Sequence, residues 1–249
     1  MSLGYAVPRP KRGPTDEERF LKMPAEPTTA KGRETQRAVL DAARTIFARD
    51  GYVEARMIDI ATEAGLSTGG LYRYFDNKTE VFAALIADIH EEFYSQSGHT
   101  RPILQTDPLA ALTEANRGYM EYYYEHRHVM RVFIEAAAID ERFRVILRNM
   151  RDRHVKRFAA AYRAIGGADQ VRGVSVEVAA EAMACMVEQC CYVWFAQEDD
   201  CNNSVSMVEA IKVTSEAWYA TMFSGAHINQ AKFAVPESAI TLPPSPAVK

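Results

Sequence analysis

The side chains best suited to binding a ligand lie in the stretch 51–78, which reads GYVEARMIDIATEAGLSTGGLYRYFDNK. Tyr72, Arg73 and Tyr74 are consecutive there, and Lys78 follows shortly after them. Tyrosine hydroxyls can donate hydrogen bonds to phosphates, and a guanidinium can bind a phosphate or the edge of a guanine. Hydroxyls and cations side by side on a short helix therefore favour contact with a nucleic-acid backbone over burial in a protein core.

Two short helices should position these side chains. Apolar spacing predicts one helix over about 57–64, closed by a glycine, and a second that Ser67 caps and that ends near Phe75. Two helices joined by such a turn form a helix-turn-helix, whose second helix enters the major groove of DNA. Leu71 and Phe75 are expected to face the core, which leaves residues 72–74 on the exposed side.

The chain resembles the TetR family of bacterial transcriptional regulators over about residues 35–90. The resemblance depends on residues in a fixed order and spacing: Ile46-Phe47, Gly51-Tyr52, Ile60-Ala61, Ala64-Gly65, Ser67, Gly69, Leu71-Tyr72, Tyr74-Phe75, Lys78 and Val81-Phe82. Together, the motif and the resemblance imply contacts to double-stranded DNA from Arg56, Ser67, Thr68, Gly69, Gly70, Tyr72, Arg73, Tyr74 and Lys78.

One site departs from the family pattern. The family usually has Thr or Ser at the two positions that Ala55 and Arg56 occupy, where they cap the helix and often contact phosphate. The cap is therefore lost or replaced here, and Arg56 is expected to reach a phosphate instead. Acidic residues also surround the motif, while Lys11, Arg12, Lys31 and Arg33 are either backbone-tracking cations or solvated charges.

The chain as a whole has no basic excess. Its 249 residues include 29 Lys and Arg against 33 Asp and Glu, for a net charge of −4, so DNA binding would depend on a local cluster. We expect a cytoplasmic protein without a membrane partner, because no long apolar run or signal-peptide layout occurs. Cys185, Cys190, Cys191 and Cys201 lack C-x-x-C spacing, which favours free, mostly buried thiols over a redox sensor.

The pattern of apolar residues predicts an all-α fold without strands. The expected units are a disordered arm (1–30), the helix-turn-helix domain (31–77), a helical effector-binding and dimerisation domain (78–224) and a flexible tail (225–249). The first helix should cover about 35–49 and end at Gly51 in the left-handed conformation. Asn77 to Glu80 reads as a capping box for the fourth helix. Further helices are expected at 107–126, 128–138, 140–165, 175–197 and 204–223.

The family resemblance implies that the larger domain binds a small molecule and dimerises. The aromatic-rich segment 119–134 and the later helices supply candidate ligand contacts, for which ordinary core packing is the alternative. These candidates are Tyr119, Tyr122, Tyr123, His126, Phe133, Phe158, Tyr162, Met183, Met186, Gln189, Cys190 and Trp194, with Met150 and Glu188 beside them. The small residues of 175–197, together with 204–223, resemble the dimer bundle of the family.

Known enzyme and metal motifs are absent from the sequence. It contains no Gly-rich phosphate loop, no H-E-x-x-H and no G-x-S-x-G, and His90, His99, His154 and His227 stand alone. We therefore expect no cofactor, no metal and no catalysis. The function implied is a homodimeric repressor that binds a palindromic operator and is released by an apolar or aromatic effector. The alternative is a helical small-molecule-binding protein that does not bind an operator.

Overall fold

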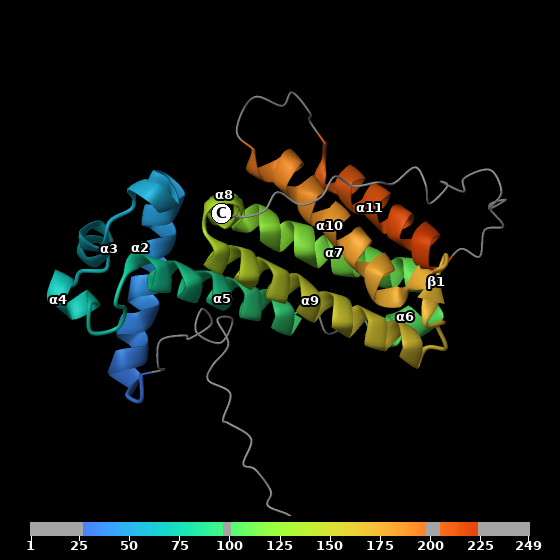
Figure 1. Ribbon diagram of the computed structural model, residues 1–249, viewed down its shortest axis with the longest axis horizontal. Helices are drawn as coiled ribbons and strands as arrows, with labels where there is room; N and C mark the ends of the chain where they lie inside the picture. The colour runs from blue at the N-terminus through green and yellow to red at the C-terminus, as the bar shows by residue number, and fades with distance from the viewer. Residues whose placement is uncertain (1–26, 97–100, 198–204, 224–249) are drawn as a thin grey trace, which may run out of the picture.

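The structure is a computed structural model that describes residues 27–96, 101–197 and 205–223, and helices make up almost all of it (Figure 1). The helices are α2 (Ala30–Glu54), α3 (Met57–Glu63), α4 (Thr68–Leu71), α5 (Lys78–Gln96), α6 (Arg101–Thr106), α7 (Pro108–Glu125), α8 (Arg127–Ile139), α9 (Glu141–Ala164), α10 (Val176–Cys191), a π-helical turn (Tyr192–Ala196) and α11 (Met207–Met222). The predicted all-α fold is confirmed. The expected tail, most of the expected arm, His99, Cys201 and His227 lie outside the described residues.

The structure differs from the predicted elements in several places. A two-stranded hairpin, β1 (Gln170–Val171) and β2 (Val174–Ser175), forms where no strand was expected. Its turn is possible because Arg172 and Gly173 both adopt positive φ, 51° and 85°. Helix α6 was not predicted. Helix α2 begins earlier than expected because the Thr29 hydroxyl caps it, accepting from the backbone N–H of Gly32 at 3.0 Å.

Gly51 interrupts α2 near its end. Its φ of 72° confirms the predicted positive φ, but its ψ of 176° is far from the left-handed helical value that was expected. This combination belongs to a region of backbone space that is essentially open only to glycine. The chain therefore changes direction at Gly51, and residues 52–54 leave the line of the helix.

Helices α2, α3 and α4, which we call the headpiece, pack around a small apolar core. Ile60 and Leu71 are fully buried in it. An aromatic cluster then joins the headpiece to α5, α8 and α9. In this cluster the ring of Phe82 lies 4.5 Å from that of Phe47 and 5.2 Å from that of Phe143, between centroids. Helix α5 is thus packed against the headpiece at one end and runs into the larger bundle at the other (Figure 1).

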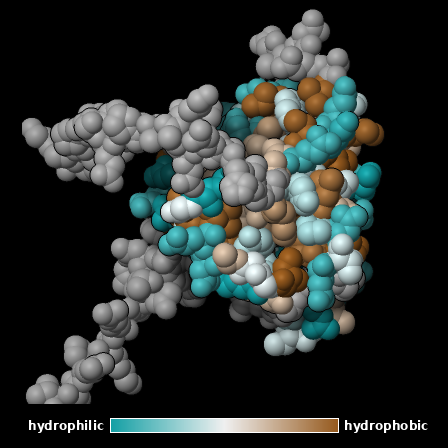
Figure 2. All heavy atoms as spheres, turned by 90° about the vertical axis from the view of Figure 1, so that its right-hand side faces the viewer, coloured by the Kyte–Doolittle hydropathy of each residue, from teal (hydrophilic) through white to brown (hydrophobic). Residues whose placement is uncertain are grey.

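The larger bundle consists of α5 to α11, with α7 packed on α11 and α9 packed on α10. A second apolar cluster closes the end near β1, where the Tyr162 hydroxyl donates to the carbonyl of Met222 at 3.0 Å. Seen from this end, hydrophilic and hydrophobic side chains are interspersed on the surface (Figure 2). None of the helices within the described ranges is long and apolar enough to cross a membrane.

Candidate functional site

The small residues at the start of α4 divide into two groups. The Ser67 hydroxyl caps the helix by accepting from the backbone N–H of Gly70 at 3.1 Å, as predicted. Gly70 is buried, and a Cβ on it would lie 3.2 Å from the Ser67 hydroxyl oxygen. Gly69 is exposed, and a Cβ there would meet nothing within 4 Å. Of the two glycines, Gly69 is therefore the one that offers bare backbone to a partner, while Gly70 and Ser67 make the cap.

The turn after α4 presents the side chains that could contact DNA. The helix was predicted to end near Phe75, but α4 ends at Leu71, and residues 72–74 form a turn. Tyr72 is 49% exposed and Arg73 is exposed, whereas Leu71 and Phe75 are buried as predicted. Tyr74 is half-buried against the headpiece core, and Thr68 is half-buried at the start of α4. Tyr72 and Arg73 therefore present an accessible hydroxyl and an accessible cation in this turn.

Lys78 makes structural contacts that its predicted role did not include. Its ammonium donates to the carbonyl oxygens of Val53 at 2.5 Å and Ala55 at 3.1 Å, and it lies 5.2 Å above the ring of Tyr52. Carbonyls at the end of a helix lack intrahelical partners and attract a cation. The first residue of α5 therefore ties that helix to the chain segment that connects α2 and α3.

The altered residues before α3 leave that helix without a side-chain cap. Arg56 occupies the N-cap position in an extended conformation and makes no capping hydrogen bond, while Ala55 is buried. The predicted loss of the cap is confirmed, and the reach of Arg56 to a phosphate stays a prediction. Lys31 and Arg33 lie in the first turn of α2, where Arg33 donates to the carbonyls of Pro27 and Thr28. Lys11 and Arg12 lie outside the described residues.

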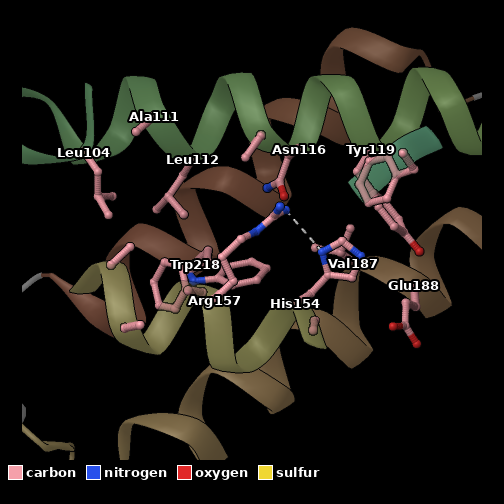
Figure 3. A pocket seen from close by; sticks show the side chains of 16 residues that line it. Leu104, Ala111, Leu112, Asn116, Tyr119, His154, Arg157, Val187, Glu188 and Trp218 are labelled. Atoms are coloured by element: carbon pink, nitrogen blue, oxygen red, sulfur yellow. Dashed lines mark hydrogen bonds between the residues drawn. The ribbon is translucent and has the colours of Figure 1, made fainter. Parts of the chain in front are cut away.

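A cavity of about 400 Å³ opens between α6, α7, α9, α10 and α11, with α5 contributing Phe93 (Figure 3). This volume falls in the range of small-molecule sites. Its wall is mostly apolar, and its polar members are Asn116, Tyr119, His154, Arg157 and Glu188. A second cavity of about 60 Å³ adjoins it and shares Phe93, Tyr119, His154 and Glu188. Helix α5 supplies three residues of the smaller cavity, Ile89, His90 and Phe93.

Only some predicted ligand contacts line these cavities. Tyr119 and Phe158 line the larger one, and Tyr119, Tyr122, Tyr123 and Met150 line the smaller one. The structure places outside both cavities His126, Phe133, Tyr162, Met183, Met186, Gln189, Cys190 and Trp194.

The excluded residues have other surroundings. Phe133 belongs to the aromatic cluster at the headpiece, and Tyr162 belongs to the cluster near β1. His126 is buried, with Nδ1 3.5 Å from the Arg44 guanidinium. Met186 and Trp194 pack against the main core, while Met183 and Cys190 are half-buried on α10 and Gln189 is exposed.

Burial disfavours the ionised forms of the three thiols of α10 and of Glu188 on the same helix. Cys185 and Cys190 are half-buried, Cys191 is buried, and all three are free, as expected. Burial raises the pKa of the Cys191 thiol far above its usual range, which disfavours the reactive thiolate. Glu188 is bound by Arg151 at 2.6 Å, as expected for a satisfied polar group, although burial still raises the pKa of its carboxyl. Within the described parts of the chain, no group of three His, Cys, Asp or Glu could hold a metal ion.

A histidine pair at the cavities was missed from the sequence. His90 on α5 and His154 on α9, expected to stand alone, lie with their Nε2 atoms 3.1 Å apart. Burial is the main reason that the pKa of His90 is lowered to about 4 and that of His154 to about 3, and the nearby Arg153 and Arg157 lower both further. Both rings are therefore neutral near pH 7 and share one hydrogen bond. No local spacing signals this pair, because 64 residues separate its members.

Comparison with known proteins gives sequence matches over part of the chain. Residues 39–85 match the family model described as bacterial regulatory proteins, tetR family. The chain is 36% identical over 63 residues to the HTH-type regulator TtgW of Pseudomonas putida, covering 25% of this chain and 47% of TtgW. It is 32% identical over 93 residues to the HTH-type transcriptional repressor BepR of Brucella suis, covering 34% of this chain and 44% of BepR. The matches thus span less than half the length of these relatives.

Solved structures share the fold over most of the chain. A transcriptional regulator of Rhodococcus sp. Rha1 has a TM-score of 0.61 at 19% identity, covering 74% of this chain and 95% of that one. A TetR-like regulator of Rhodococcus sp. RHA1 has a TM-score of 0.55 at 22% identity, covering 75% and 94%. These similarities extend the shared fold beyond the headpiece into the larger bundle. Residues 39–85 are thus similar to the bacterial regulatory proteins of the tetR family, and the fold of the chain is that of these solved structures.

Proposed function

We propose that this protein is a ligand-responsive transcriptional repressor that binds a palindromic operator as a homodimer. Residues 31–77 would form the DNA-binding domain and residues 78–224 the effector-binding and dimerisation domain. One observation carries the proposal. Helix α5 begins with Lys78, which binds the Val53 and Ala55 carbonyls of the headpiece, and its later residues His90 and Phe93 line the cavities. A single rigid element thus connects the two proposed sites.

DNA contact in this proposal depends on few groups. Tyr72 and Arg73 would contact the DNA from the turn after α4, and the bare backbone of Gly69 permits close approach. A dimer is required because two recognition helices must lie about 34 Å apart, or a multiple of it, to reach successive major grooves. Exposed apolar residues on α10 and α11, among them Val178, Val208 and Val213, supply a surface that a second subunit could bury.

An effector in the larger cavity would change the position of α5. Because Phe93 forms part of the wall, a ligand that requires a different position of this side chain favours a different position of the helix. Lys78 would carry that shift to the segment before α3. The coupling needs only that the ligand binds the two arrangements with different affinity.

The test is a DNA-binding titration by fluorescence anisotropy, with DNA from upstream of the protein's own gene. Arg73→Ala should weaken binding about tenfold or more, and Tyr72→Phe should weaken it less, since each removes a phosphate or base contact. Tyr124→Phe is a matched control, because Tyr124 is 47% exposed but lies on α7, and Arg117→Ala serves likewise. Unchanged affinity in both headpiece variants would contradict the site.

Lys78→Ala is a poorer test of DNA contact than the sequence suggests. Its ammonium holds two backbone carbonyls, so its removal alters the headpiece as well as any phosphate contact. A shallower salt dependence with unchanged thermal unfolding would still indicate a lost phosphate contact.

The second candidate is a small-molecule-binding protein that no longer reads DNA. The missing cap at Arg56 and the acidic residues around the motif are the observations in its favour. Footprinting on the upstream region separates the two functions. Ligand binding without any footprint would favour the second candidate.

A further inference from the structure

Three side chains with hydrogen-bonding groups, each from a different helix, lie at the polar part of the wall of the larger cavity. Asn116 comes from α7, Arg157 from α9 and Trp218 from α11, and Figure 3 shows Asn116 and Arg157 projecting into the space from facing helices. The Nη1 of Arg157 donates to the carbonyl of Tyr94 at 2.9 Å, and its Nη2 lies 3.5 Å from Nδ1 of His154. These contacts hold the guanidinium plane at the cavity wall.

Arg157 differs electrostatically from Arg151 and Arg153 of the same helix. Burial lowers the pKa of Arg157, and neighbouring Arg153 lowers it further. A hydrogen bond that the guanidinium donates to a carboxylate is the main reason that the pKa of Arg151 and of Arg153 is raised. An anion placed in the cavity beside Arg157 would offset its desolvation.

Trp218 adds a donor that needs an acceptor. Its Nε1–H is buried and has no hydrogen-bond partner in the described part of the chain. Such a buried donor without an acceptor is destabilising relative to a satisfied one. The amide nitrogen of Asn116 donates hydrogen bonds to the hydroxyl oxygens of Ser215 at 3.0 Å and Thr214 at 3.4 Å. These bonds fix the orientation of the Asn116 side chain. The cavity therefore presents an oriented polar group, an unsatisfied donor and a cation.

The rest of the wall is apolar and partly made of very small side chains. Leu104, Leu112 and Phe158 form one part, and Ala160, Ala161 and Ala184 leave space where larger residues would fill it. Glu188, the acidic member of the lining, is already paired with Arg151 at 2.6 Å. One cation beside an apolar chamber matches a ligand with one negative charge and a hydrocarbon body.

We propose that the larger cavity binds a monoanionic amphiphile, whose carboxylate pairs with Arg157 and whose hydrocarbon body lies against Leu112 and Phe158. The inference rests on the proposed effector role of this cavity and specifies the chemical class of the ligand. It adds a negative charge to the expectation of an apolar or aromatic effector. The Nε1–H of Trp218 then acts as a specificity group at the polar end of the ligand, because it can donate to a carboxylate oxygen.

The test measures binding to the full chain without DNA, by calorimetry. The probes are decanoate, 1-decanol and decylamine, which share a hydrocarbon chain and differ in the charge of the head. Decanoate should bind about tenfold or more tightly than decanol, and decylamine should bind most weakly. Arg157→Gln should remove the preference for decanoate and leave the affinity for decanol nearly unchanged.

Two control variants keep the result interpretable. Arg153→Gln removes a positive charge from the same helix outside the cavity, and it should retain the preference for decanoate. Ala161→Phe fills the cavity and should abolish binding of decanoate and decanol, with thermal unfolding as the check on folding. Equal affinity for decanoate and decanol in the unaltered protein, a preference that survives Arg157→Gln, or no binding of any probe would overturn the inference.

A parallel DNA titration distinguishes this inference from the proposed function. If decanoate binds with the expected preference but leaves DNA binding unchanged, the ligand class stands and the regulatory response fails. If decanol releases DNA as well as decanoate does, the response stands and the ligand class fails.

Discussion

The headpiece and the larger bundle place their polar groups in opposite ways. The headpiece fills its interior, with Leu71 and Phe75 buried, and turns Tyr72 and Arg73 outward. The larger bundle brings Asn116, the histidine pair and Arg157 inward around two adjoining cavities of about 400 Å³ and about 60 Å³. A partner as large as DNA has to be met from outside, whereas a small molecule has to be enclosed. Side chains in a filled interior should therefore contribute more to stability through packing than side chains at the wall of a cavity.

The largest expected effect tests this difference in packing. Phe82→Ala should lower the free energy of unfolding by about 3–5 kcal/mol, because Phe82 is fully buried in the aromatic cluster. Phe158→Ala should lower it by only about 1–2 kcal/mol, because Phe158 already borders a cavity. Urea denaturation followed by circular dichroism measures both. Equal losses would show that the cavity wall is as tightly packed as the aromatic cluster.

A smaller effect concerns the histidines inside the larger bundle. Their pKa values in the fold, about 4 for His90 and about 3 for His154, lie below the 6.5 of an unfolded chain, so the unfolded state binds more protons as the pH falls. Stability is complete above pH 6.5 and should decrease by about 2 kcal/mol between pH 7 and pH 5, after allowing for solvent screening. Urea unfolding at several pH values measures it.

The double variant His90→Gln/His154→Gln isolates this contribution. The free energy of unfolding of this variant should depend less on pH. The pH dependence that remains should include a contribution from His126, whose pKa is also lowered mainly by burial. An unaltered pH dependence in the double variant would show that the pair is not the source.

The smallest effect returns to the headpiece. Arg56→Thr should raise the free energy of unfolding by about 0.5–1 kcal/mol, because the extended N-cap residue would gain a side-chain hydrogen bond to the first turn of α3. The same change should weaken DNA binding if Arg56 contacts a phosphate. Arg56→Ala separates the two effects, since it removes the charge without adding a cap. A lower stability for the Thr variant than for the Ala variant would contradict the missing-cap interpretation.

Prediction from sequence succeeded where function depends on neighbours along the chain. The cap by Ser67 and the burial of Leu71 and Phe75 follow from spacing within one or two turns, and the structure confirms them. The role of Lys78 could not be found this way. Its acceptors lie 23 and 25 residues earlier, and they reach its ammonium only because the chain turns at Gly51.

The cavity was predicted only in part, for a related reason. Aromatic density in 119–134 pointed to Tyr119, Tyr122 and Tyr123, which line a cavity, but also to Phe133, which does not. The helix breaks at His126, so the phase of α7 does not continue into α8. The groups that give the cavity its charge come from separate helices, and no local pattern connects them.

Gly51 and Gly69 illustrate two different reasons why a position can be restricted to glycine. At Gly51 the backbone angles exclude every other residue even though no neighbour lies within 4 Å of a Cβ. At Gly69 both the backbone and the surrounding space would accept a side chain. In a library of random variants, selection for folding alone should retain glycine at position 51 and accept other residues at position 69. Selection for operator binding should retain both, so the two glycines would separate the demands of the fold from those of its partner.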